Sequence, residues 1–184
     1  MSKPSQVFIL GEDANKAQQN LIRKYLKKRG FSDRQIRDLP CPVGETPGIS
    51  FVLSDFAKQV HNLRVATSSK GLIVAIDADE ETVATRKSQL EEKLRTAGEA
   101  ARGEQEAIAI VVPKRNVETW IWYLEGNAVD ETSNYKKSSV SGNHDMAEAK
   151  RAFADFIVSG QVPFEDCPPS LEDARIELLR IPHS

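Results

Sequence analysis

The sequence is poor in the residues that build zinc sites and disulfide-bonded scaffolds. Its 184 residues contain two cysteines, Cys41 and Cys167, which are far apart and belong to no CxxC pair. The three histidines form no ligand pattern such as HxxxH. Isolated cysteines of this kind are usually reduced in a cytoplasmic protein. We therefore expect neither a zinc site nor a disulfide.

Long apolar runs are also missing, and neither sign of charge is in large excess. No segment approaches the roughly 20 apolar residues that a membrane-spanning helix needs, and residues 1–10 hold too short an apolar run for a signal-peptide core. A net charge of −2 gives no global indication of binding to nucleic acid or to a membrane. The 40% hydrophobic and 28% charged residues are typical of a globular protein. These features predict a cytoplasmic protein without a membrane partner.

Strand-like and helix-like segments alternate along the chain, which is typical of a parallel sheet covered by helices. Three apolar runs are predicted as strands, at residues 7–10, 72–76 and 108–112, and residues 36–41 are a fourth strand candidate, against which Pro40 counts. Apolar residues at helical spacing predict helices near 14–29, 50–63, 80–101, 117–124, 149–157 and 171–179. We expect Glu91 and Arg95 to form an i,i+4 ion pair on the third of these helices.

The predicted fold class is therefore α/β, with a central, mainly parallel four-stranded sheet flanked by helices. We expect residues 1–126 to form this α/β domain. Residues 127–184 are predicted as a loop and a helical C-terminal extension that packs on the same domain.

The most informative segment is GLIVAIDAD, residues 71–79. Its apolar residues do not alternate with polar ones, which indicates a strand buried on both faces. Asp77 and Asp79 follow at the carboxyl end, where open α/β sheets bind their ligands. If the strand continued through them, both side chains would point the same way, about 6–7 Å apart. Such a pair favours a divalent cation.

Two other predicted strands also end in charged residues. Glu12 and Asp13 follow the first strand, and Lys114, Arg115 and Glu118 follow the fourth. Because the carboxyl ends of parallel strands open onto one edge of the sheet, we expect these groups to converge with the aspartates. Mg²⁺ takes oxygen ligands and keeps several waters, so a few carboxylates suffice for one ion. A nearby lysine or arginine could bind a phosphate or stabilise a transition state.

A purely structural explanation of the same residues stays open. Acidic residues often follow strands because they cap the next helix, and Asp13 and Asp79 are both candidates for such caps. Lys114 and Arg115 are equally compatible with a solvated loop.

The two acidic junctions resemble the TOPRIM domain, which topoisomerases and bacterial primases share. The resemblance covers residues 7–124 and depends on VFILGED and LIVAIDAD, with Glu12 and the Asp77–Asp79 pair at the matching positions. It implies a Rossmann-like TOPRIM fold. One departure is that many TOPRIM domains place a glycine after the glutamate, whereas here Gly11 precedes it and Asp13 follows.

In particular, the chain resembles the small TOPRIM nucleases of phage-defence systems, some of which are paired with ATPases. The resemblance implies a hydrolase that cleaves DNA or RNA with Mg²⁺ or Mn²⁺. The catalytic candidates are Glu12, Asp77, Asp79, Glu118 and Lys114. The metal-ligand candidates are Glu12, Asp13, Asp77 and Asp79. The candidates for phosphate or nucleic-acid contact are Lys114, Arg115, Lys27, Lys28 and Arg29. An ATPase partner and a homo-oligomer are left open.

Two other functions compete with the nuclease. The chain could be a non-catalytic interaction subunit of such a defence complex, with its acids binding metal weakly or not at all. It could also be a phospho-acceptor receiver domain, which gathers acids after its first and third strands. The receiver pattern has a single acceptor aspartate and a lysine after a fifth strand, whereas this sequence has Asp-x-Asp and predicts four strands.

Overall fold

The computed structural model describes residues 2–12, 16–135 and 146–183, so Asp13 lies outside the described residues. Its centre is one sheet of four strands in the order β2-β1-β3-β4, and every neighbouring pair is parallel. The strands are β1 (Gln6–Gly11), β2 (Ile36–Leu39), β3 (Lys70–Ala75) and β4 (Ile108–Val111). This confirms the predicted α/β class with a four-stranded sheet.

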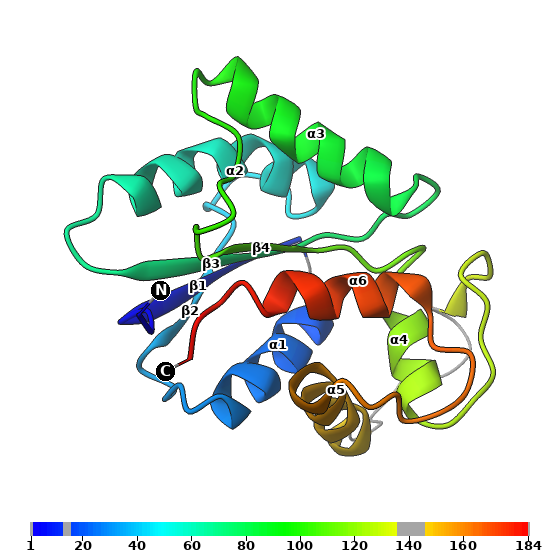
Figure 1. Ribbon diagram of the computed structural model, residues 1–184. Coiled ribbons are helices and arrows are strands. Elements are labelled where there is room, and N and C mark those ends of the chain that lie inside the picture. Colours follow the sequence, from blue (N-terminus) through cyan, green and yellow to red (C-terminus); the bar gives the residue numbers. More distant parts are fainter. Residues whose placement is uncertain (1, 13–15, 136–145, 184) are drawn as a thin grey trace.

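Helices cover both faces of the sheet (Figure 1). One face carries α2 (Ile49–Arg64) and α3 (Val83–Thr96). The other face carries α1 (Ala17–Lys28), α4 (Val117–Leu124), α5 (Ala147–Ser159) and α6 (Pro169–Leu178). The helical C-terminal part thus packs against α1 and β4. No helix in the described part of the chain is long and apolar enough to cross a membrane.

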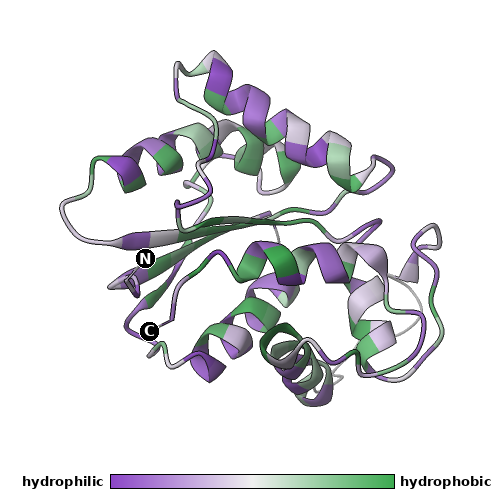
Figure 2. Cartoon of the chain, in the orientation of Figure 1, coloured by the Kyte–Doolittle hydropathy of each residue, from purple (hydrophilic) through white to green (hydrophobic). Residues whose placement is uncertain are grey.

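The central strands are apolar because both of their faces are covered. In β3 and the residue after it, Leu72, Val74 and Ile76 pack toward α2 and α3. Ile73 and Ala75 pack into the core on the opposite face. The hydropathy colouring shows the same apolar layer running through the sheet (Figure 2). Strand alternation thus determines which core each residue from Leu72 to Ile76 joins. Each such side chain contributes about 1.5–3 kcal/mol to stability on full burial.

Helix α3 is shorter than the helix predicted at residues 80–101. It begins at Val83 and ends at Thr96. Its N-cap is Thr82, whose side-chain oxygen accepts a hydrogen bond from the Thr85 amide at 2.9 Å. Thr82, and not the candidate Asp79, is therefore the cap of this helix. At the other end, Gly98 adopts a φ of 76°, a left-handed conformation that costs glycine little and stops the helix.

The predicted ion pair between Glu91 and Arg95 is also wrong. Arg95 pairs with Glu92, three residues before it. Glu91 instead accepts from Arg102 at 2.6 Å. Helix spacing allows either the i,i+3 or the i,i+4 partner, and the turn after α3 brings Arg102 back to take Glu91.

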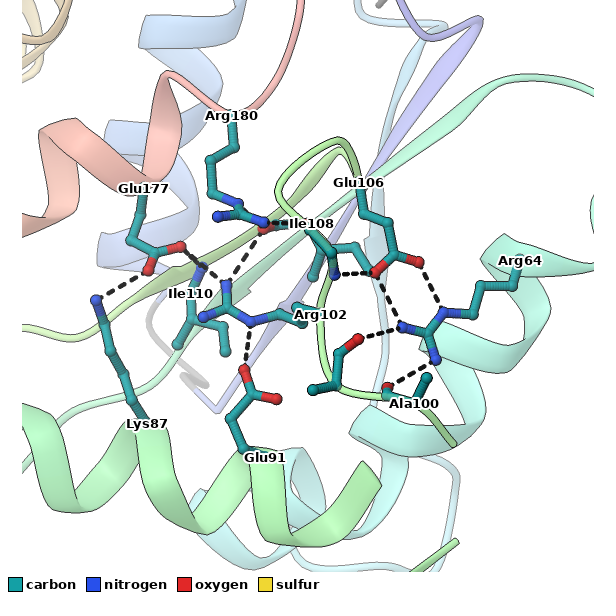
Figure 3. A network of polar contacts seen from close by, with 12 residues as sticks. Arg64, Lys87, Glu91, Ala100, Arg102, Glu106, Ile108, Ile110, Glu177 and Arg180 are labelled. Carbon is teal, nitrogen blue, oxygen red and sulfur yellow. Dashed lines mark hydrogen bonds and ion pairs between the residues drawn. The ribbon is translucent and has the colours of Figure 1, made fainter. Parts of the chain in front are cut away.

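Side chains of α6, of the segment that follows α6 and of the α3–β4 connection cover the outer edge of β4, which is an edge strand of the sheet (Figure 3). The Glu177 carboxylate accepts a hydrogen bond from the Ile110 amide at 3.0 Å. Arg180 and Arg102 both donate to the Ile108 carbonyl, at 2.9 and 3.3 Å. These side chains satisfy backbone groups that a fifth strand would otherwise pair, and they tie the C-terminal helix to the sheet.

Candidate functional site

The connections to α1 and α3 leave the sheet in opposite directions. After β1 the chain turns to α1 on one face, and after the neighbouring β3 it turns to α3 on the other face (Figure 1). Open α/β sheets bind ligands at such a switch point, outside the carboxyl ends of the strands. Glu12 directly follows β1 and Asp77 lies just beyond β3, so both acids stand at this position.

Glu12 and Asp77 are in direct contact. The Glu12 carboxylate accepts a hydrogen bond from the backbone N–H of Asp77, which lies 65 residues further along the chain. The Asp77 carboxylate in turn accepts a hydrogen bond from Gln18 Nε2 in the first turn of α1, at 2.5 Å. Asp77 is 8% exposed and Gln18 is 2% exposed. The structure therefore brings together two of the predicted acids, with a glutamine that holds one of them.

Asp79 occupies a different environment from Asp77. Strand β3 ends at Ala75, and Asp79 has a φ of 53°, in the left-handed region. Its backbone N–H donates to the Arg115 carbonyl at 3.1 Å, and its side chain is partly exposed. The premise that the strand continues through both aspartates is wrong, because the chain turns between them. Asp77 is buried, whereas Asp79 lies in the turn that leads to α3 and is half-buried.

Arg86 holds the backbone of this turn in place. This side chain is 5% exposed and lies in the first turns of α3. Its Nε donates to the Asp77 carbonyl at 3.1 Å and its Nη2 to the Ala78 carbonyl at 3.1 Å. Its Nη1 donates to Gln89 Oε1 at 2.7 Å. A buried cation thus fixes the segment that presents Asp77.

Sequence reasoning missed Gln18 and Arg86, although both interrupt an apolar pattern. Gln18 lies three and four residues before Leu21 and Ile22, on the buried side of α1. Arg86 lies four residues before the buried Leu90 on α3. A polar residue at a core-facing helix position is a signal that it has a buried polar partner, and that signal was present in the sequence.

The junction after β4 lies beside the turn that carries Asp79. Lys114 donates to the Glu81 carbonyl. Arg115 pairs with Glu80 at 3.2 Å and has a φ of 69°. Both side chains are half-buried, and so is Glu118 in the first turn of α4. The two basic residues are therefore on the same edge of the sheet as the acids.

The basic end of α1 is not at this edge. Helix α1 starts beside Glu12 and runs back across the sheet, so its last turn lies near the amino ends of the strands. Lys27 pairs with Asp33 at 2.8 Å, and Lys28 pairs with Asp155. Arg29 contacts the His183 ring. The structure thus separates Lys27, Lys28 and Arg29 from Glu12 and Asp77.

Within the described residues, no group of three or more His, Cys, Asp or Glu side chains is gathered for a metal ion. Mg²⁺ keeps several waters and is commonly bound through one or two carboxylates plus substrate phosphates. Glu12 and Asp77 are the predicted ligands that the structure brings into contact, and the predicted ligand Asp13 falls outside the described residues.

No family of known proteins, curated protein or solved structure matches this chain. Its function is therefore inferred from the fold and from the chemistry of these residues.

Proposed function

We propose that this chain is a TOPRIM-like nuclease that hydrolyses phosphodiester bonds of DNA or RNA with Mg²⁺ or Mn²⁺. The observation that supports it best is the meeting of Glu12 and Asp77 at the switch point of a parallel sheet. Glu12 is half-buried and Asp77 is buried, so two acidic side chains lie close together at the edge of the sheet. Their placement at the usual ligand position of such sheets favours a role in binding.

In this proposal Glu12 and Asp77 hold the cation, with Asp79 and Asp13 as further ligands. The bound ion would orient a phosphate and stabilise the charge that develops on its oxygens. Lys114 and Arg115 lie on the neighbouring junction and would contact the phosphate. Lys114 now donates to the Glu81 carbonyl, so phosphate binding would replace that hydrogen bond. Glu118 would serve as a further ligand or as a general base.

The proposal extends to a cytoplasmic role in antiviral defence, with an ATPase as a partner. A chain with a net charge of −2 has little general attraction for a polyanion. The basic end of α1 also lies at the far edge of the sheet and is engaged with Asp33 and Asp155. A partner protein or a second copy would therefore supply part of the positive surface that a nucleic acid needs.

The test is cleavage of labelled DNA and RNA by the purified chain with Mg²⁺, with Mn²⁺ and with a chelator. Asp77→Asn removes one charge but keeps an oxygen that can accept from Gln18, so the fold should survive. We expect it to abolish metal-dependent cleavage. Asp55→Asn is the matched control, because Asp55 on α2 also accepts a part-buried hydrogen bond from a glutamine, Gln59. Undiminished cleavage by Asp77→Asn would contradict the proposed site.

One observation favours the alternative of a non-catalytic interaction subunit. The Glu12 and Asp77 carboxylates both accept hydrogen bonds from the protein itself, as structural carboxylates do. In that case the chain would bind no Mn²⁺ at millimolar concentration and would still assemble with its partner. The receiver-domain alternative has less support, because the described residues form four strands and its lysine would follow a fifth.

A further inference from the structure

Gln18 has one buried polar atom that the fold does not use. Its Nε2 donates to Asp77 Oδ1. A carboxylate only accepts hydrogen bonds, so the amide must turn its NH₂ group toward Asp77 and its oxygen elsewhere. That oxygen, Gln18 Oε1, is buried and has no hydrogen-bond partner within the described part of the chain. The hydrogen bond to Asp77 thus sets the orientation of the Gln18 amide, and in this orientation Gln18 Oε1 has no partner among the described residues.

Packing alone does not explain a glutamine at this position. Gln18 is 2% exposed and shares the buried side of α1 with Leu21, Ile22 and Tyr25. Leaving a buried acceptor without a partner costs about 1–3 kcal/mol. A methionine of similar shape would avoid that cost and suit the core. This arrangement favours a functional role for both the NH₂ group and the oxygen of the Gln18 side chain.

Asp77 is also fixed from its other side. Arg86 holds the Asp77 carbonyl, and Glu12 accepts from the Asp77 amide. The backbone of Asp77 is therefore held at both its N–H and its C=O. The hydrogen bond from Gln18 Nε2 to Asp77 Oδ1 also restricts rotation of the side chain. Such outer contacts commonly tune the affinity of a carboxylate for a metal ion.

We propose that Gln18 is a positioning residue of the ligand site, an inference that rests on the proposed metal-binding role of Asp77. Its Nε2 holds the Asp77 carboxylate in one orientation. Its Oε1 accepts a hydrogen bond from a donor that arrives with the ligand, such as a water molecule that accompanies a hydrated cation. The amide does both without adding a negative charge, whereas a glutamate would repel Asp77 and Glu12.

The experiment measures Mn²⁺ binding by titration calorimetry, independently of any cleavage. Four proteins are compared: the wild-type chain, Asp77→Asn, Gln18→Met and Gln59→Met. Gln59→Met is the matched control, since it removes a glutamine-to-aspartate hydrogen bond of 2.6 Å away from the site. We expect Gln18→Met to weaken Mn²⁺ binding about 10- to 100-fold and Gln59→Met to leave it unchanged. Thermal melts without metal show that each variant is folded.

The outcomes separate the two proposals. Absence of Mn²⁺ binding by the wild-type chain, or wild-type binding by Asp77→Asn, would overturn the proposed metal site and with it the role of Gln18. Loss of binding in Asp77→Asn together with wild-type binding in a folded Gln18→Met would overturn the role of Gln18 alone. In that case Gln18 would be a structural residue of the core.

A second variant covers the case in which Gln18→Met does not fold. Gln18→Glu keeps the shape of the side chain and places another negative charge beside Asp77. We expect its melting temperature without metal to fall, because the carboxylates repel. Mn²⁺ should then raise the melting temperature by more than it does in the wild-type chain. An equal or smaller rise would contradict contact between Gln18 and the ligand site.

Discussion

The carboxylate of Glu177 accepts the hydrogen bond that the Ile110 amide of β4 would otherwise offer to a further strand, at 3.0 Å. The same carboxylate is 3.0 Å from Arg102 and 2.9 Å from Lys87 (Figure 3). An uncovered edge strand can pair with another chain. Helix α6 prevents this on the β4 side by placing a charged side chain where a fifth strand would lie.

This contact predicts a pH-dependent contribution of Glu177 to stability. Burial raises the pKa of Glu177, but the hydrogen bonds from Arg102 and Ile110 and the nearby charges outweigh it, so the pKa is lowered overall. A carboxyl whose pKa is lower in the folded state stabilises the protein above its unfolded value of about 4.3. This contribution is lost as the pH falls through the lowered pKa. Glu177→Gln should therefore lower the free energy of unfolding by about 2 kcal/mol at pH 7. The loss should become progressively smaller below pH ~4.

Urea unfolding followed by circular dichroism at neutral and acidic pH would measure both values. Glu92→Gln is the control, because Glu92 pairs with Arg95 on the exposed side of α3. Its urea midpoint should stay close to that of the wild-type chain at neutral pH. A Glu177→Gln cost that is as large at pH 3 as at pH 7 would rule out the carboxylate as its source.

Arg86 should be needed for the stability of the turn after β3. Arg86→Met removes the donors to the Asp77 and Ala78 carbonyls. Leaving buried acceptors without partners should lower the free energy of unfolding by about 3 kcal/mol, measured by urea titration. Arg95→Met on the solvent side of the same helix should have little effect. Equal effects of the two substitutions would mean that the Arg86 hydrogen bonds add nothing.

Gly11 packs closely against the Gln19 side chain and has no left-handed backbone angle. A Cβ at this position would lie 2.4 Å from Gln19 Nε2, and Gln19 is itself buried. We expect Gly11→Ala to destabilise the chain by about 1–3 kcal/mol in thermal or urea unfolding. At Gly103 an added Cβ meets nothing closer than 3.6 Å, so Gly103→Ala should be nearly neutral. Similar costs at both glycines would contradict this packing.

Asp79 combines a special backbone conformation with an acidic side chain, and substitutions can separate the two. Its φ of 53° suits aspartate, asparagine and glycine but not β-branched residues. Asp79→Val should cost about 1–2 kcal/mol, whereas Asp79→Asn should stay within about 0.5 kcal/mol of the wild-type chain. Thermal melts would measure both. If Asp79→Asn weakened Mn²⁺ binding without lowering stability, the Asp79 carboxylate would be a ligand. If Asp79→Val were as stable as the wild-type chain, the left-handed backbone conformation of Asp79 would be contradicted.

The strands and the two acidic junctions could be predicted from the sequence because they depend on neighbouring residues. The apolar run before Asp77 indicated a buried strand, and the strand candidate at residues 36–41 proved to be β2, which ends at Leu39. The ends of α3 were predicted less well. Thr82 competes with Asp79 for the cap, and no local pattern shows which of them has the right backbone conformation.

The supporting residues of the site could not be predicted in the same way. Gln18 meets Asp77 across 59 residues, and Glu177 meets Ile110 across 67. These partners are chosen by the packing of α1 and α6 on the sheet. A core-facing polar residue indicates that some partner exists, but its identity depends on how distant segments are brought together.

Local sequence alone was enough for the α/β class, for a four-stranded sheet and for acids at the ends of β1 and β3, because strand patterns and turn residues act over short distances. The tertiary structure decided that Glu12 and Asp77 touch and that the chain turns between Asp77 and Asp79. It also placed Lys27, Lys28 and Arg29 at the opposite edge from these acids. These outcomes depend on strand order and on the direction in which each helix crosses the sheet, and both are consequences of packing the whole chain around one core.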